Sequence, residues 1–317
     1  MSGRRQDISR KTGRRLFTVL DRVILGYLIA FIVGLLLLGR GNPSWLPVVI
    51  THLGILAAVV WIIVRWRDRT TGLTGLLRQL YPILLYPFFY NQAKHTTHWV
   101  HQGFMDHQVV AMERAVFGVD PNVWIQPVQT ALVNEWMMAG YFAYYLILLI
   151  LVLPFHFSGR TMDVRRILTA TTITFVISYV GFALYPVEGP RYYLSLQFAQ
   201  GLSGWAFVPL VNWIIAGAAF HGGCMPSSHA AVALVVLLWA RRTRPGLARW
   251  LAPLVFTLFL ATVWGRFHNV TDVVVGWAVG LIGFALADWL CKAEDSVPVP
   301  GMVEKRPASA IGLEAAA

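Results

Sequence analysis

Long apolar runs dominate this 317-residue chain, and several approach the roughly 20 residues that a helix needs to cross a bilayer. Charged residues make up 13% of the chain and hydrophobic residues 57%, so its charged share is about half that of an ordinary soluble domain. A soluble protein of this length has no way to keep so much apolar surface from water. Only helices and closed barrels satisfy the backbone hydrogen-bonding groups in lipid, and the runs lack the alternation of apolar and polar residues that barrel strands show. We therefore predict an all-α fold, a polytopic bundle of membrane helices.

Eight membrane-spanning segments are predicted, and the last six are expected to form the core. Pro82 and Pro87 interrupt the third segment, so we expect a kinked helix there and leave open whether it crosses fully. The predicted spans are 22–38, 45–64, 74–93, 132–155, 164–185, 227–240, 250–267 and 272–290.

The distribution of basic residues predicts the orientation. With the N-terminus in the cytoplasm, 21 of the 26 Lys and Arg residues lie on the cytoplasmic side and 5 on the opposite side, as the positive-inside rule requires. Both termini are then cytoplasmic, and Cys224 and Cys291 lie on opposite faces, where they do not pair. The net charge of +11 reflects this bias and attraction to anionic lipids. No basic groove indicates nucleic-acid binding.

Four parts of the chain follow from this topology. Residues 1–21 form a basic cytoplasmic N-terminus, and residues 22–69 form two extra N-terminal transmembrane helices. Residues 70–291 form the membrane domain that carries the motifs described next. Residues 292–317 are predicted to be a disordered cytoplasmic tail. Within the membrane domain, residues 186–225 are expected to be an external segment that is Gly-rich towards its end.

The string Pro226-Ser227-Ser228-His229 opens one of the apolar runs. Proline suits the first turn of a helix and serine is a good N-cap. The free amides of such a turn can hold a phosphate, and the two serine hydroxyls add donors. His229 then stands within reach of an ester oxygen, to which an imidazolium can donate a proton. The alternative is an ordinary helix start with an interfacial histidine.

His268 and Asp272 open the next apolar run at i, i+4 spacing, which puts both on one helical face. A carboxylate bonded to one ring nitrogen leaves the other nitrogen as a nucleophile. Asp272 lies at the edge of the hydrocarbon, where an ionisable residue is costly and marks a functional site by default. The alternative is that Asp272 only caps the helix. The presence of His229 on the same side of the membrane favours a joint site.

Arg191, within Gly189-Pro190-Arg191-Tyr192, is one of the few basic residues predicted on the non-cytoplasmic side. A guanidinium binds phosphate oxygens through two parallel N–H groups. The alternative is a headgroup anchor beside the tyrosines. Under the predicted topology, the loops holding Arg191, His229 and His268 all converge on this side of the membrane.

In this order and spacing, the three segments resemble the type 2 phosphatidic acid phosphatase superfamily over about residues 70–290. The resemblance implies that His268, oriented by Asp272, attacks phosphorus and becomes a phosphohistidine. It also implies that His229 is the acid and base. The residues that it implies for phosphate binding are Arg191, Ser227, Ser228 and Arg266.

The chain departs from this family pattern in three places. The lysine that usually precedes the first-motif arginine by six or seven residues is replaced by Leu184 and Tyr185. Tyr192 follows the arginine in place of proline. Thr262 occupies the position of an arginine in the last motif, so Arg266 is the expected substitute. These features, with the segment 106–121, look more like the branch containing inositol phosphorylceramide synthases, which transfers phosphate groups to alcohols as well as hydrolysing esters.

Three functions are weighed on this basis. The first is an integral membrane lipid-phosphate phosphatase or phosphotransferase that needs no metal or other cofactor, with its active site on the periplasmic, extracellular or lumenal side. Its partners are a lipid phosphate substrate, membrane lipids and an alcohol acceptor such as inositol. The second is a transferase that moves a phospho-alcohol headgroup onto a lipid acceptor. The third, a membrane transporter, ranks below these because the spans lack polar residues at mid-depth.

Other polar residues of the external segments receive structural interpretations. His95, His98, His101 and His107 are scattered around a helix and no cysteine joins them, which disfavours a metal site. Residues 105–121 are predicted to be an amphipathic interfacial helix that ends at Gly118. Three external carboxylates are expected to be structural, with the orientation of an acceptor hydroxyl as the alternative: Asp106, Glu113 and Glu135.

Overall fold

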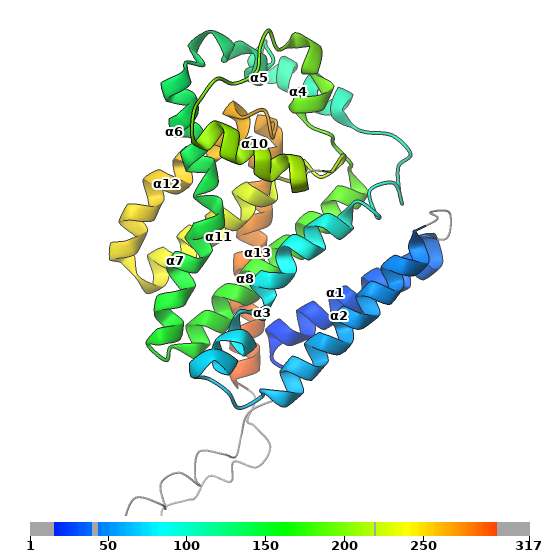
Figure 1. Ribbon diagram of the computed structural model, residues 1–317, viewed down its shortest axis with the longest axis vertical. Coiled ribbons are helices and arrows are strands. Elements are labelled where there is room, and N and C mark those ends of the chain that lie inside the picture. Colours follow the sequence, from blue (N-terminus) through cyan, green and yellow to red (C-terminus); the bar gives the residue numbers. More distant parts are fainter. Residues whose placement is uncertain (1–15, 40–43, 219, 297–317) are drawn as a thin grey trace, which may run out of the picture.

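The computed structural model describes residues 16–39, 44–218 and 220–296. Helices account for the regular structure of these residues, and a single isolated bridge joins Val187 and Gly223. Figure 1 shows the long helices as a bundle with short helices gathered over one end. The predicted all-α fold is confirmed.

Helices occupy every predicted span. They are α1 (Val19–Leu38), α2 (Trp45–Arg65), α3 (Gly72–Ala93), α6 (Ala131–Phe142), α7 (Tyr144–Phe157), α8 (Thr161–Leu184), α11 (Ser228–Thr243), α12 (Pro245–Trp264) and α13 (Val270–Ser296). The span predicted over 132–155 is divided, because α6 and α7 meet at Ala143 with a bend of 41°. In the described part of the chain, 5 helices are long and apolar enough to cross a membrane, or 6 if α6 and α7 form one span.

Two predicted spans fall outside that set for different reasons. The helix α11 is short, at 16 residues, and α3, with 22 residues, is less apolar and contains Pro82 and Pro87. The count of eight crossings therefore stays a prediction.

Short helices make up the end of the bundle that carries the motifs. They are α4 (Asp106–Phe117), α5 (Pro121–Trp124), η2 (Gln126–Val128), α9 (Pro190–Tyr193), η3 (Ser195–Gln197) and α10 (Phe207–Ala218). The helix α4 ends at Gly118 in the left-handed conformation, with φ 73°, as its sequence predicts. The helix α10 was not predicted within the segment 186–225. It packs on α6 and lies across the bundle in Figure 1.

Close packing of α13 on α11 positions the site. A Cβ atom at Gly276 would lie 2.5 Å from the carbonyl oxygen of Ser227, and one at Gly280 would lie 2.6 Å from that of Ala231. Only glycine allows these backbones to approach so closely, and the Gly-x-x-x-Gly spacing of Gly276 and Gly280 puts both on the face that meets α11. The first turns of α11 and α13, each of which carries a motif, therefore lie side by side.

The opposite end of the bundle is held by ion pairs. Asp21, fully buried in α1, accepts hydrogen bonds from both terminal nitrogens of Arg78 at 3.0 and 2.7 Å and from Tyr81 at 2.9 Å. These contacts attach α1 to α3. The helix α13 continues to Ser296, later than the predicted start of the tail at residue 292. The rest of that tail and most of the predicted basic N-terminus lie outside the described residues.

Candidate active site

The two motif histidines face one another. His229 lies in the first turn of α11, and His268 lies in the loop before α13. His268 Nε2 is 3.4 Å from His229 Nδ1, and His268 is 3% exposed. Two segments 39 residues apart thus bring their imidazoles together, as the sequence predicts.

Asp272 stands behind His268 on the first turn of α13. Its Oδ2 atom lies 3.6 Å from His268 Nδ1 and accepts a hydrogen bond of 2.7 Å from the Asn269 backbone N–H. The carboxylate is fully buried. The two interpretations of Asp272 are therefore compatible, because the same oxygen stabilises the helix start and faces the imidazole.

The loop that carries His268 is fixed by backbone hydrogen bonds. The N–H groups of Phe267 and His268 both donate to the Thr262 carbonyl oxygen, at 3.0 and 3.1 Å. The Asn122 side chain donates to the His268 carbonyl oxygen at 3.1 Å. Arg266 adopts φ 62°, a conformation that non-glycine residues rarely take. The tight loop presents the imidazole of His268 towards α11.

The serines of the first motif have different roles. The Ser227 hydroxyl caps α11 by accepting from the Ala230 N–H at 3.3 Å, and the Ser227 N–H donates to the Asp272 carbonyl oxygen at 2.9 Å. Ser227 is fully buried, whereas Ser228 lines a cavity. Only Ser228 therefore stands where it can meet a ligand directly.

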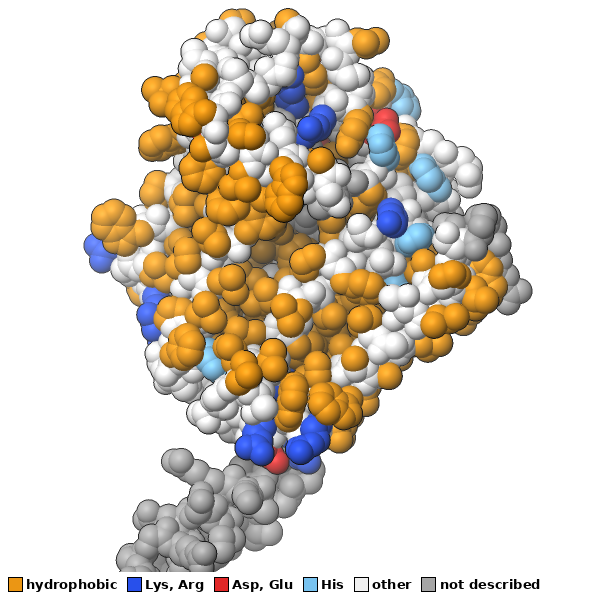
Figure 2. Space-filling view, viewed as in Figure 1, with side chains coloured by type: hydrophobic (Ala, Val, Ile, Leu, Met, Phe, Trp, Pro, Cys, Tyr) orange, Lys and Arg blue, Asp and Glu red, His pale blue; other side chains and the backbone are white. Residues whose placement is uncertain are grey.

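A cavity of about 550 Å³ opens beside the histidines. One end is lined by polar side chains, which include Glu188, Arg191, Ser228, His229 and His268. The remainder is apolar and aromatic, with walls from α3, α7, α8 and α10: Ile83, Tyr86, Pro87, Tyr144, Leu148, Leu149, Phe175, Tyr179, Ile214 and Ile215. Figure 2 shows hydrophobic side chains around a hollow on this face of the molecule.

Arg191 lies at the polar end of this cavity. Its guanidinium contacts Asn212 Oδ1 at 3.4 Å and lies 5.8 Å from the centre of the Phe267 ring. The preceding loop is held by Asp106, whose carboxylate accepts from the backbone N–H groups of Glu188 and Gly189 at 2.9 and 2.8 Å. The structure thus brings Arg191 to the same cavity as both histidines.

Arg266 points elsewhere. Its terminal nitrogens donate to the Gln200 carbonyl oxygen at 2.9 Å and to Gln129 Oε1 at 3.0 Å, and it lies 4.0 Å from the centre of the Phe198 ring. Burial, and secondarily the charge of Arg191, lower the pKa of Arg266. Arg266 is not among the residues that line the cavity. The structure therefore does not bring it together with the other predicted phosphate-binding residues.

A model of the PAP2 superfamily matches residues 107–286, which is more than half of the chain and includes all three motif segments. The chain belongs to the PAP2 superfamily. The family recognised from the motifs is confirmed. Neither the curated proteins nor the solved structures compared with this chain gave a match. PAP2 membership supports a phosphatase-like hydrolase of phosphoric esters, and the long apolar helices are compatible with a multi-pass membrane protein.

Three carboxylates around the PAP2 site bind backbone amides. Asp106 holds the Arg191 loop, Glu113 Oε1 accepts from the Thr271 N–H at 2.6 Å, and Glu135 accepts from four N–H groups at the start of α10. Burial raises the pKa values of Asp106 and Glu113 above their ordinary values. These contacts favour the structural interpretation of all three residues over the orientation of an acceptor.

Tyr141 is a site residue that the sequence did not indicate. Its hydroxyl lies 3.0 Å from His229 Nε2, and the ring of Tyr144 packs against His229 with centroids 4.4 Å apart. Both tyrosines flank the bend at Ala143. An aromatic run within a span gives no sign of which ring will meet a histidine on another helix. The pairing depends on how α6 and α7 pack on α11 and was not visible in the local pattern.

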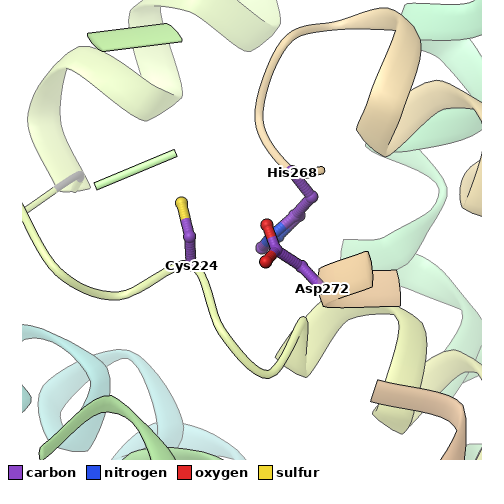
Figure 3. A group of neighbouring side chains, drawn as sticks. All are labelled: Cys224, His268 and Asp272. Carbon is purple, nitrogen blue, oxygen red and sulfur yellow. The ribbon is translucent and has the colours of Figure 1, made fainter. Parts of the chain in front are cut away.

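Three residues at and beside His268 bring together atoms that could hold a metal ion. Cys224, His268 and Asp272 each bring a donor atom within 4.8 Å of the others, and Figure 3 shows Cys224 opposite the other two. The Cys224 thiol, however, hydrogen bonds to the carbonyl oxygens of Glu188 and Phe267 at 3.1 and 3.2 Å, and burial raises its pKa. A metal-binding cysteine must lose its proton, so this trio fits a metal poorly. Among the described residues, His95–His107 form no such cluster.

Proposed function

We propose that this protein is an integral membrane lipid-phosphate phosphatase or phosphotransferase that works through a phosphohistidine at His268. One observation carries the proposal. His268 Nε2 and His229 Nδ1 lie 3.4 Å apart at the polar end of a cavity whose remainder is apolar, with Asp272 behind the nucleophile.

The first half-reaction uses the two imidazoles in opposite roles. Asp272 keeps the proton of His268 on Nδ1, so Nε2 carries the lone pair that attacks phosphorus. As the N–P bond forms and the ester P–O bond breaks, His229 donates its Nδ1 proton to the departing oxygen. The phosphoryl group enters between the rings, so substrate binding must separate the two nitrogens from their contact in the free protein.

The second half-reaction reverses the proton transfer. Neutral His229 takes a proton from water or an alcohol as that oxygen attacks phosphorus and the N–P bond to His268 breaks. Charge on the phosphoryl oxygens is stabilised by Arg191, Ser228 and the free amides of the first turn of α11. The chain's own donors supply this stabilisation.

The apolar part of the cavity supports a lipid substrate. The residues of α3 that line it run from Ile83 to Asn91, a rise of about 12 Å along a helix. Half the hydrocarbon core of a bilayer is about 15 Å deep. A phosphate held at His268 therefore leaves its chain in a space about as deep as one leaflet, beside the aromatic walls of α7 and α8.

The side of the membrane follows from the basic residues. The described Arg residues at the end of the bundle opposite the site, such as Arg65, Arg165 and Arg166, belong to the segments predicted to be cytoplasmic. We place the active site on the periplasmic, extracellular or lumenal side, with both termini in the cytoplasm.

Transfer to an alcohol is the alternative outcome of the same chemistry. Asn91, Glu188 and Tyr192 line the cavity together with Arg191 and offer hydrogen-bond partners for a hydroxyl-bearing acceptor. The phospho-headgroup transferase predicted from the sequence uses these groups to seat the alcohol in place of water.

The test is turnover of a panel of lipid phosphates by the purified protein. We expect His268→Ala to abolish phosphate release, and His107→Ala, which changes an exposed histidine of α4, to retain it. Free phosphate indicates hydrolysis, and a new lipid formed only when inositol is added indicates transfer. Wild-type rates from His268→Ala would remove the proposed nucleophile.

A further inference from the structure

Four side chains form one continuous series through the active site. Asp272 Oδ2 lies 3.6 Å from His268 Nδ1, and His268 Nε2 lies 3.4 Å from His229 Nδ1. The series continues from His229 Nε2 to the Tyr141 hydroxyl, at 3.0 Å. The shortest of the three contacts is thus the one made by a residue outside the motifs.

We propose that Tyr141 is a positioning residue that fixes Nδ1 as the nitrogen through which His229 exchanges protons. This inference rests on the proposed function. A histidine has two nitrogens, and the partner of one decides which tautomer is present and which nitrogen is left for chemistry. Tyr141 occupies Nε2, so Nδ1 faces His268 and the arriving phosphate.

A phenol suits this position because its oxygen can accept a hydrogen bond from the ring in both protonation states that the reaction uses. Nε2–H of His229 donates to the Tyr141 oxygen both in the imidazolium and in the neutral ring that remains after Nδ1 has given up its proton. The Nδ1 proton passes to the leaving oxygen in the first half-reaction and is replaced from water or an alcohol in the second. Tyr141 keeps its own proton throughout.

Packing holds both rings in this arrangement. The Tyr141 ring lies 4.5 Å from the Phe267 ring, and Tyr144 lies against the other side of His229. Tyr141 is 2% exposed. The titratable groups that face His229 are Tyr141 from α6, Tyr144 from α7 and His268 from the loop before α13, and Arg191 and Tyr145 line the same cavity.

Tyr141→Phe tests the inference because it removes only the hydroxyl. We expect kcat to fall about tenfold while KM changes less than about twofold, since a proton-transfer group is affected and phosphate binding is not. The alkaline limb of the pH profile of kcat moves to lower pH. The reason is that the His229 imidazolium loses the hydrogen-bond acceptor that stabilises it. Tyr193→Phe, which removes the hydroxyl of an exposed tyrosine that does not line the cavity, keeps the wild-type kcat and profile.

A double-mutant cycle separates positioning from general packing. In a His229→Gln background, Tyr141→Phe should change the residual rate by less than about twofold, because the group it positions is gone. A tenfold loss that persists in this background overturns the inference, as does an unshifted alkaline limb in Tyr141→Phe.

Three further outcomes are distinguishable. If Tyr141→Phe does not fold, 3-fluorotyrosine at position 141 keeps the shape and makes the hydroxyl a weaker acceptor, so an unchanged pH profile overturns the inference. If His268→Ala retains activity, the proposed function itself fails. Loss of activity in His268→Ala with a wild-type Tyr141→Phe rejects only the role of Tyr141.

Discussion

Single side chains at this site serve the fold and the chemistry together. Asp272 accepts the Asn269 N–H at the start of α13 and also lies 3.6 Å from His268 Nδ1. Ser227 caps α11 through its hydroxyl, and its N–H donates to the Asp272 carbonyl oxygen. The proposed nucleophile and acid are therefore held by the same contacts that begin their helices.

The two arginines near the site are expected to differ. Arg191 lines the cavity, so Arg191→Ala should raise KM for a lipid phosphate at least about tenfold, whereas Arg191→Lys should recover part of the loss. Arg266→Ala should lower the melting temperature and change KM less than about threefold, because its partners are Gln129 and Gln200. Steady-state kinetics and thermal unfolding in detergent check both. The opposite pattern would return Arg266 to the phosphate site.

At the scale of residues, the sequence predicted which residues form the site better than it predicted where their side chains point. The two motif strings and the helix start at Ser227 were enough to identify the central groups. The expectation that His268 and Asp272 share one helical face was wrong, because α13 begins at Val270 and His268 lies in the loop before it. The direction of Arg266 follows from a φ of 62° and from partners in two distant loops. Neither is encoded in the local pattern, which counts Arg266 only as a basic residue near His268.

Helix ends are the elements on which the site is built. Carboxylates from α4 and α6 bind backbone amides at the starts of α13 and α10, and Asp106 does the same for the loop before α9. The glycines of α13 then allow its first turn to lie against α11. The elements are thus fixed by contacts between helices that are distant in the sequence.

Glu113, the carboxylate of α4 that binds the start of α13, gives a pH-dependent prediction. Burial raises the pKa of Glu113 above 4.5, so its ionised form is penalised in the folded state. Its contribution to stability is fully present below the unfolded pKa and is lost as the pH rises through the folded pKa. Glu113→Gln should therefore gain melting temperature relative to the wild type as the pH rises above about 4.5. A relative gain by the wild type over this range would contradict the assignment.

The cavity wall gives a second prediction at this scale. Leu148→Trp on α7 should fill the apolar part of the cavity, raising KM at least about tenfold for a long-chain phosphate and leaving a short soluble ester unaffected. Leu146→Trp is the matched control, because Leu146 lies on the exposed face of the same helix. Equal effects on long and short substrates would argue against a chain in this cavity.

Elements were predicted well where composition decides them and poorly where packing does. Long apolar runs and Gly118 predicted the helices α1, α2, α4 and α8. The helix α10 was missed because its 12 residues are too few for a span and lie in a Gly-rich segment. The bend at Ala143 was also missed, because a continuous apolar run does not show where one helix ends and the next begins at an angle.

The whole molecule separates its charges along the bundle. The ion pairs of Asp21, Arg78, Arg165 and Glu294 gather at one end, whereas His229, His268 and Arg191 gather at the other. This separation accords with a membrane orientation in which the site opens away from the cytoplasm.

Cysteine labelling tests that orientation. Leu196 in the short helix η3 is fully exposed, and Arg67 lies in the exposed turn after α2. In intact cells an impermeant maleimide should label Leu196→Cys and should label Arg67→Cys only after permeabilisation. The wild type, whose two cysteines are not exposed, serves as the control. The reverse labelling would place the site in the cytoplasm.

Trapping the covalent intermediate tests the central claim most directly. The protein is mixed with a lipid carrying radiolabelled phosphate, quenched in alkali during turnover and digested. We expect label that is stable to alkali and labile to acid on the peptide containing His268, and none in His268→Ala. Turnover with no label on His268, or with label on His229 or Cys224, would contradict the account.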